Sequence, residues 1–328
     1  MASFFKQPGN RWLVASVFLV LILAVISTFI GVYEISLKSL LNPENLQEAM
    51  VFAASRIPRT IAAMLVGMSM GVAGMIMQML SHNKFVSPST AGTTEAASLG
   101  ILIITMFAPN SSVLMKLVVS ALFALAGTML LLALLKRIPL RSPLVVPLIG
   151  IMLGSVIAAA TTFLAYRYNF LQSLNAWTTG DFSRVLRGRY EMLWLSGALT
   201  AAAYFVADRF TLAGMGEAFS RNLGLNYGRI VAIGMAIVSL VTAVNVVTVG
   251  AIPFIGLVIP NVASLLIGDN VRKAIPWIAV LGAGFVLASD IIGRVLRFPY
   301  EIPIGVVVGF VGSAVFLVML LRGDTRVA

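Results

Sequence analysis

Nine runs without a charged residue divide this 328-residue chain, and they limit its possible folds more than any other feature. The runs are 12–33, 60–83, 96–115, 117–135, 142–166, 192–207, 230–268, 274–289 and 302–321. All but one are 16 to 25 residues long, near the roughly 20 residues that an α-helix needs to cross a bilayer. The exception, 230–268, must hold two helices. Gly250, Pro253 and Pro260 place the break inside it and make its second helix short or irregular. The sequence therefore predicts ten transmembrane helices.

The composition excludes the soluble alternatives. Only 11% of the residues are charged, against about 25% in an ordinary globular domain, and the mean hydropathy is +1.00. One soluble core of this length cannot bury 59% apolar residues, and a disordered chain would be far more polar. We therefore expect an all-α polytopic membrane protein that forms a single transmembrane domain over residues 1–328.

The residue types that carry most enzyme chemistry are scarce. The chain has no Cys, a single His82 and no Gly-Lys pair, so we expect no metal site, no cofactor and no Walker A loop for nucleotide hydrolysis. Glu95 and Asp290 are acidic, but both fall toward the ends of predicted spans, which disfavours an ion-coupled secondary transporter. The sequence therefore indicates a transport or channel subunit that is not an enzyme.

The basic residues bear on orientation and on partners. A net charge of +11 fits loops that meet anionic lipid headgroups better than it fits a nucleic-acid partner. An even number of spans puts both termini on one side. If that side is the cytoplasm, it holds 13 of the 23 Lys and Arg residues, a weak bias. Many arginines therefore remain on the predicted outer side, among them Arg56, Arg59 and Arg294. Their presence on that side requires an explanation.

The longest predicted inner loop, 208–229, contains a short helix. Gly214 and Gly216 interrupt the chain, residues 217–223 can form a helix, and Gly224 can end it in the left-handed conformation. Phe219 and Leu223 would share one face, with Ala218 beside them. The pattern leaves two interpretations open, namely docking onto a partner and lying on the membrane surface.

Several motifs, in order along nearly the whole chain, resemble the FecCD-type permeases. The motifs are Arg56-Ile-Pro-Arg59, Gly74-x3-Gln78, the GEAFSRNLGL segment at 216–225, the VGAIPFIGLVIPN segment at 249–261, Ala288-Ser-Asp290-x3-Arg294 and Glu301-Ile-Pro-Ile-Gly305. These permeases are the membrane subunits of ABC importers for ferric siderophores, haem and cobalamin. The resemblance implies a cobalamin-importer-like permease fold in the bacterial cytoplasmic (inner) membrane, with iron(III)-siderophore as substrate and haem or cobalamin as alternatives.

The resemblance also implies partners and assigns roles to residues. It implies a separate ABC ATPase, a periplasmic or lipid-anchored siderophore-binding protein, and a second permease that is a copy of this chain or a paralogue. Arg56, Arg59 and Arg294 would dock the binding protein. The fifth and tenth spans would line the pathway, with Arg141 and Ser142 at the gate and Val145 and Leu148 along the wall. The residues that would couple to the ATPase are Gly216, Glu217, Ala218, Ser220, Arg221, Leu223 and Gly224.

Two local sequences refine this resemblance. Asn261 follows Pro260 where the family commonly has His, so any role of that histidine does not carry over. Residues 83–92 and 210–216 are most similar to the branch that serves catecholate-type siderophores such as petrobactin and vibriobactin.

Overall fold

The computed structural model describes residues 9–31, 46–138 and 144–322, and within these ranges the regular structure is helical, with no strand. The all-α prediction is thereby confirmed. The elements are α1 (Asn10–Phe29), α3 (Leu46–Val51), the π-helix η1 (Phe52–Arg56), α4 (Ile57–Ser81), α5 (Thr93–Phe107), α6 (Val113–Leu135), α7 (Val145–Arg167), α8 (Leu171–Thr178), α9 (Leu193–Ala213), α10 (Glu217–Asn222), α11 (Tyr227–Thr248), α12 (Ile255–Ile267), α13 (Val271–Val295) and α14 (Ile304–Arg322).

Each of the ten predicted spans corresponds to one helix. In the described ranges, six helical segments are long and apolar enough to cross a membrane, and α5, α12 and α14 are shorter apolar helices. The remaining predicted span corresponds to α9, which carries Asp208 and Arg209 near its C-terminal end. The run 230–268 divides as predicted into α11 and the 13-residue α12, and Gly250 at the break has a positive φ of 94°.

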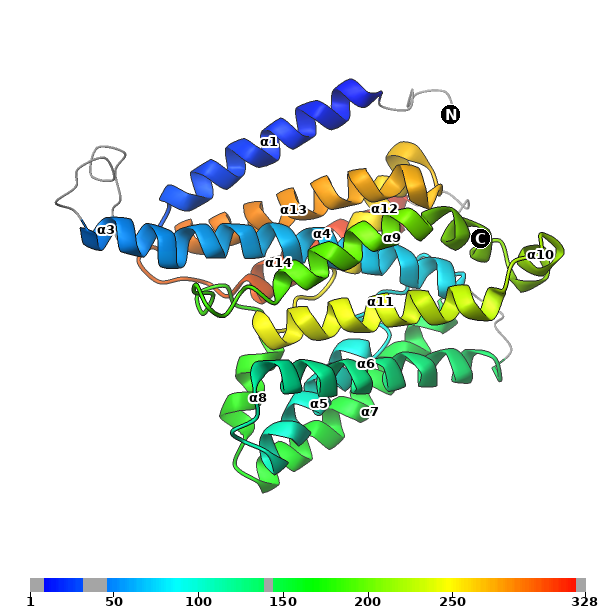
Figure 1. The fold of residues 1–328 in the computed structure, drawn as a ribbon, viewed down its shortest axis with the longest axis horizontal. Coiled ribbons are helices and arrows are strands. Elements are labelled where there is room, and N and C mark those ends of the chain that lie inside the picture. Colours follow the sequence, from blue (N-terminus) through cyan, green and yellow to red (C-terminus); the bar gives the residue numbers. More distant parts are fainter. Residues whose placement is uncertain (1–8, 32–45, 139–143, 323–328) are drawn as a thin grey trace.

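Helix α4 runs through the centre of the bundle, and α13, α12, α9 and α11 pack around it (Figure 1). Two glycines allow the closest approaches. A Cβ on Gly67 would collide with the carbonyl of Gly282 in α13, and a Cβ on Gly74 would collide with the carbonyl of Gly256 in α12. Gly67 and Gly74 therefore serve the close packing of α4 against its neighbours. Small residues let backbones approach where lipid supplies no hydrophobic drive between helices.

The segment 83–92 between α4 and α5 turns back into the bundle. His82 ends α4 in the left-handed conformation, and Ser87 is fully buried. Gly92, the residue before α5, packs on Gly154, which lies near the middle of α7. Helix α5 therefore begins about halfway along the span of α7.

The two ends of the bundle differ in structure. Helix α3 and η1 extend from α4 at one end, and the short α10 lies at the opposite end, on the side where α1 begins (Figure 1). With the orientation expected from the sequence, α3 marks the outer end and α10 the cytoplasmic end.

Candidate functional site

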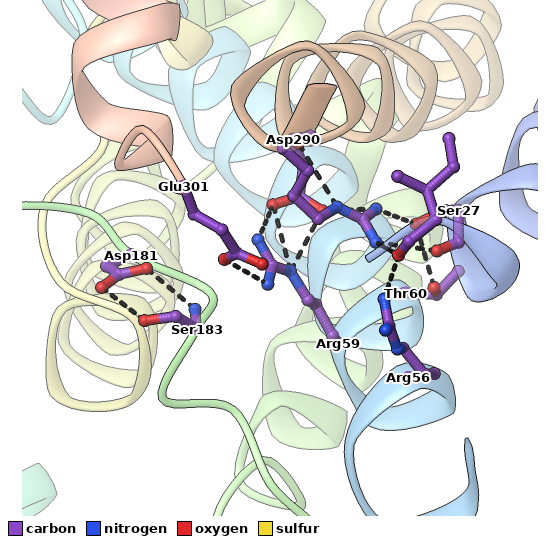
Figure 2. Close-up of polar contacts among 10 residues, drawn as sticks. Ser27, Arg56, Arg59, Thr60, Asp181, Ser183, Asp290 and Glu301 are labelled. Atoms are coloured by element: carbon purple, nitrogen blue, oxygen red, sulfur yellow. Dashed lines mark hydrogen bonds and ion pairs between the residues drawn. The ribbon is translucent and has the colours of Figure 1, made fainter. Parts of the chain in front are cut away.

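A buried cluster of charged side chains lies at the outer end (Figure 2). Arg59 of α4 donates from Nη2 to Oδ1 of Asp290 in α13 at 2.8 Å, and from Nη1 to Oε2 of Glu301 at 2.7 Å. Arg294, one turn after Asp290, pairs with the second carboxylate oxygen of Asp290 at 2.8 Å. The carboxylate of Asp290 therefore joins two guanidinium groups, and Glu301 pairs with the first of them.

The same cluster fixes the end of α1. Arg294 donates from Nη1 to the carbonyls of Ser27 and Ile30 at 2.8 and 2.7 Å, and from Nη2 to Oγ of Ser27 at 2.6 Å. Arg56 also donates to the carbonyl of Ile30. Carbonyls in the last turn of a helix have no partner within the helix, so these arginines both satisfy them and place positive charge at the negative end of the helix dipole.

Docking of a binding protein at Arg56, Arg59 and Arg294 would require exposed side chains, but the structure buries all three. Arg59 is 9% exposed and Arg294 is 3% exposed, and Arg56 is also buried. They are buried because α13 and the residues before α14 bring two carboxylates to α4, a pairing that no local pattern reveals. Their role in docking a binding protein stays a prediction.

Other arginines at this end are exposed. They are Arg184, Arg187 and Arg189 in the segment between α8 and α9, and Arg297 after α13. The backbone N–H of Arg187 donates to the carbonyl of Ala54 at 2.9 Å, which places this segment beside η1. Exposed arginines thus lie at the surface of the outer end, together with the exposed Glu191 and close to a buried cluster of paired charges.

The short helix predicted between α9 and α11 exists as α10. Gly224 has a φ of 73°, the left-handed conformation expected of a residue that ends a helix. The Oγ of Ser220 donates to the carbonyls of Leu212 and Gly216, which ties α10 to the end of α9. Phe219 and Leu223 are 42% and 54% exposed. The helix is therefore held to the bundle by a hydrogen-bonded serine while its apolar face is uncovered.

The predicted pathway residues lie along α7. Val145 is half-buried, and Leu148, Ile151 and Val156 are exposed along one side of the helix. The predicted gate residues Arg141 and Ser142 lie outside the described residues. Helix α14 likewise presents exposed apolar side chains, including Val306 and Phe310. Two apolar helix faces are thus left uncovered by the chain itself.

Glu95 lies deeper than the sequence indicated. The sequence placed it toward the end of a span, but Gly154, near the middle of α7, lies beside its carboxyl group: a Cβ added there would be 3.4 Å from Oε2. The difference arises because segment 83–92 returns into the bundle before α5 starts. No sequence pattern within α5 predicts that segment 83–92 returns into the bundle. Within the described ranges, no three His, Asp or Glu side chains gather as a metal site.

Comparison with known proteins adds evidence from outside the chain. The model of the FecCD transport family matches residues 19–322. The petrobactin import system permease protein YclN of Bacillus subtilis is 51% identical, with 93% of this chain and 96% of the relative covered. The ferric-anguibactin transport system permease protein FatD of Vibrio anguillarum is 40% identical, with 92% and 96% covered.

A solved structure shares the fold. It is described as an inward-facing conformation of a metal-chelate type ABC transporter, and it superposes with a TM-score of 0.78 at 24% identity. The match covers 96% of this chain and 99% of that one. The expected permease fold is thereby confirmed.

Proposed function

Because this chain belongs to the FecCD transport family, we propose that it is the membrane-spanning permease subunit of an ABC importer that carries a ferric siderophore across the cytoplasmic membrane. The chain is a multi-pass membrane protein. The named relatives import petrobactin and ferric-anguibactin, and they support an iron-siderophore cargo here. In this proposal the permease itself is not an enzyme, and a separate ATPase subunit hydrolyses the nucleotide.

The observation that carries the coupling part of the proposal is the uncovered apolar face of α10. A six-residue helix cannot be stable alone, yet Ser220 and Gly224 hold it in place while Phe219 and Leu223 point outward. We propose that this face, within the segment 208–229, sits in a cleft of the ATPase. Closure of the ATPase would then move α9 and α11, which flank α10 in the chain.

The outer end would receive the substrate-binding protein. Docking at Arg56, Arg59 and Arg294 remains part of the proposal. Because these three are buried, the exposed Arg184 and Arg187 would supply the first contacts with an acidic surface. Such surface charges mainly raise the association rate and fix the orientation of the partner.

A second permease, a copy of this chain or a paralogue, would cover the apolar faces of α7 and α14. Val145 and Leu148 would then line a pathway between the two subunits, with Arg141 and Ser142 at its cytoplasmic entry. An apolar wall suits passage rather than tight binding. The affinity for cargo would therefore reside in the binding protein.

Uptake of a panel of radio-iron siderophores, by a deletion strain with and without this gene, tests the function. We expect uptake of at least one ferric siderophore to depend on the gene and on ATP, and an ATPase to co-purify with the chain. Equal uptake of every ferric siderophore in the two strains would contradict the substrate class, and uptake that follows an ion gradient alone would contradict the ABC mechanism.

A further inference from the structure

A cavity of about 260 Å³ lies beside Glu95 and has no role in the function proposed above. It is formed by α5, α7 and α8 together with Ala251, which lies in the break between α11 and α12. The lining residues are Thr94, Glu95, Ser98, Ala158, Thr161, Thr162, Leu174, Thr178 and Ala251. More than half of them carry a side-chain oxygen, although the cavity lies between helices that are otherwise apolar.

Two buried oxygens in this cavity have no hydrogen-bond partner in the described part of the chain. They are Oγ1 of Thr94 and Oε2 of Glu95. Thr94 is only 7% exposed, so bulk water does not compensate for the missing partner. A buried polar atom without a partner costs about 1–3 kcal/mol, and more when the group is charged. These two atoms are therefore available to hydrogen-bond with a molecule that enters the cavity.

Three of the five hydroxyl groups of the wall are oriented as acceptors. Ser98 donates to the carbonyl of Thr94 at 3.0 Å, Thr161 donates to that of Ile157 at 2.7 Å, and Thr178 donates to that of Leu174 at 3.0 Å. Each of these hydroxyls thus uses its proton within its own helix and offers only lone pairs to the cavity. Acceptors therefore outnumber donors in the cavity, where the hydroxyls of Thr94 and Thr162 are the only side-chain donors among the lining residues that are not already engaged within the described part of the chain.

The charges of the wall select the kind of ligand. Glu95 is the one ionisable side chain among the lining residues, and none of them is Lys, Arg or His. An acceptor-rich cavity with one carboxylate suits a monocation that carries several N–H donors. It suits a di- or trivalent metal ion poorly, because such an ion would need further anionic ligands or imidazoles.

We infer that the cavity beside Glu95 is a binding site for an ammonium group, with the carboxylate of Glu95 as its counter-charge and the hydroxyl of Thr94 as an additional acceptor. The ammonium group can belong to a small free amine or to an amine arm of the transported chelate. The second source rests on the proposed function, whereas the existence of the site does not.

Labelling with a carbodiimide tests the site in the purified full-length chain. The reagent adds to carboxyl groups that are shielded from water and protonated part of the time, and mass spectrometry locates the adduct. We expect Glu95 to be labelled and Asp290 to remain unlabelled, because Asp290 is paired with two arginines. Methylammonium should protect Glu95, whereas tetramethylammonium, which has the charge but no N–H donor, should not.

Protection experiments with sodium and potassium ions test whether the ligand is an ammonium group or an alkali-metal ion. Equal protection by sodium or potassium at the same concentration would overturn the inference in favour of an alkali-metal site. If no cation protects Glu95 from the reagent, Glu95 is a buried acid without a cation ligand, and the inference is overturned. If Glu95 is not labelled, infrared difference spectra on adding methylammonium replace the assay. A carboxyl band that changes in the native chain and not in Glu95→Gln supports the site, and its absence contradicts it.

Substitution of one threonine separates binding from general packing. Thr94→Val should raise the methylammonium concentration that gives half-protection by about tenfold, the effect of losing one hydrogen bond to a charged group. Thr105→Val is the matched control, because Thr105 lies in the same helix, donates to Ile101 and does not line the cavity. Equal effects of the two substitutions would contradict a direct contact of Thr94 with the ligand.

An uptake assay distinguishes the two sources of the ammonium group. Cells carrying the native chain or Glu95→Gln are given a ferric chelate with a protonated amine arm, or the same chelate with that arm acetylated. A several-fold larger loss for the amine-bearing chelate identifies the cargo as the source, and equal losses alongside methylammonium protection identify a free amine. If the native chain takes up neither chelate, these chelates are not its cargo, and the labelling result then supports a free amine as the source of the ammonium group.

Discussion

The buried charge cluster and the short helix α10, which lie at opposite ends of this protein, use charged and apolar side chains in opposite ways. At the outer end, Arg59, Asp290 and Arg294 are buried and paired with one another. At the cytoplasmic end, the ion pair between Asp208 and Arg272 is exposed, while α10 turns an apolar face outward. The outer charges hold helices together, whereas the apolar face of α10 is uncovered and is the face that we propose for the ATPase. Residue type alone therefore does not tell a structural position from a binding position.

The largest effect is expected at Asp290. Asp290→Asn would leave Arg59 and Arg294 buried without their shared counter-charge, and breaking a buried pair in this way costs about 3–5 kcal/mol. We expect a marked fall in the melting temperature of the detergent-purified chain and less protein in the membrane.

The exposed pair at the other end provides the control for Asp290. Asp208→Asn removes the partner of Arg272, and because an exposed pair contributes about 0–1 kcal/mol, the melting temperature should hardly change. Similar losses for the two substitutions would mean that the outer cluster does not hold the helices together as the geometry indicates.

The next effect concerns coupling and should leave stability intact. Ala218→Asp with Leu223→Asp would place carboxylates on the face that we propose for the ATPase, where they would be buried without a partner. We expect uptake to fall to background and the ATPase to be lost on co-purification. Stability should change little, since exposed substitutions alter it by about 0.5 kcal/mol.

A conservative pair of substitutions controls for the change of sequence in α10. Ala218→Ser with Leu223→Met keeps the size and much of the apolar character of the face, so uptake should be retained. Full uptake by the aspartate pair, at equal amounts in the membrane, would remove α10 from the coupling mechanism.

The smallest effect is expected from the exposed outer arginines. Arg184→Glu with Arg187→Glu should weaken the affinity for the binding protein a few-fold at low salt, because an exposed pair contributes on the order of 1 kcal/mol or less. The effect should shrink as salt is added. Titration of the purified binding protein at two salt concentrations measures it.

The buried arginines provide the contrast to this pair. Arg56→Glu with Arg59→Glu should reduce the amount of folded chain, since it puts carboxylates beside Asp290 and Glu301. If this pair instead weakens docking in a salt-dependent manner with an unchanged melting temperature, while the exposed pair has no effect, then Arg56 and Arg59 contact the binding protein directly.

The sequence alone predicted the features that depend on short stretches of chain. The spans followed from apolar runs long enough for one helix, and the break between α11 and α12 followed from Gly250 and its neighbours. The short helix α10 and its ending at Gly224 followed from spacing and from the freedom of glycine to adopt a positive φ. Each of these features is decided by residues within a few turns of one another.

Tertiary structure decided which polar residues are buried and what they face. Arg59 and Asp290 are 231 positions apart, so no local pattern could show that they are paired instead of exposed. Glu95 begins a helix in the sequence, yet the return of segment 83–92 carries it to the middle of α7. Apolar length fixes where helices form, because helical hydrogen bonds are local. The environment of a charge depends on which helices pack together, and only the folded bundle determines that.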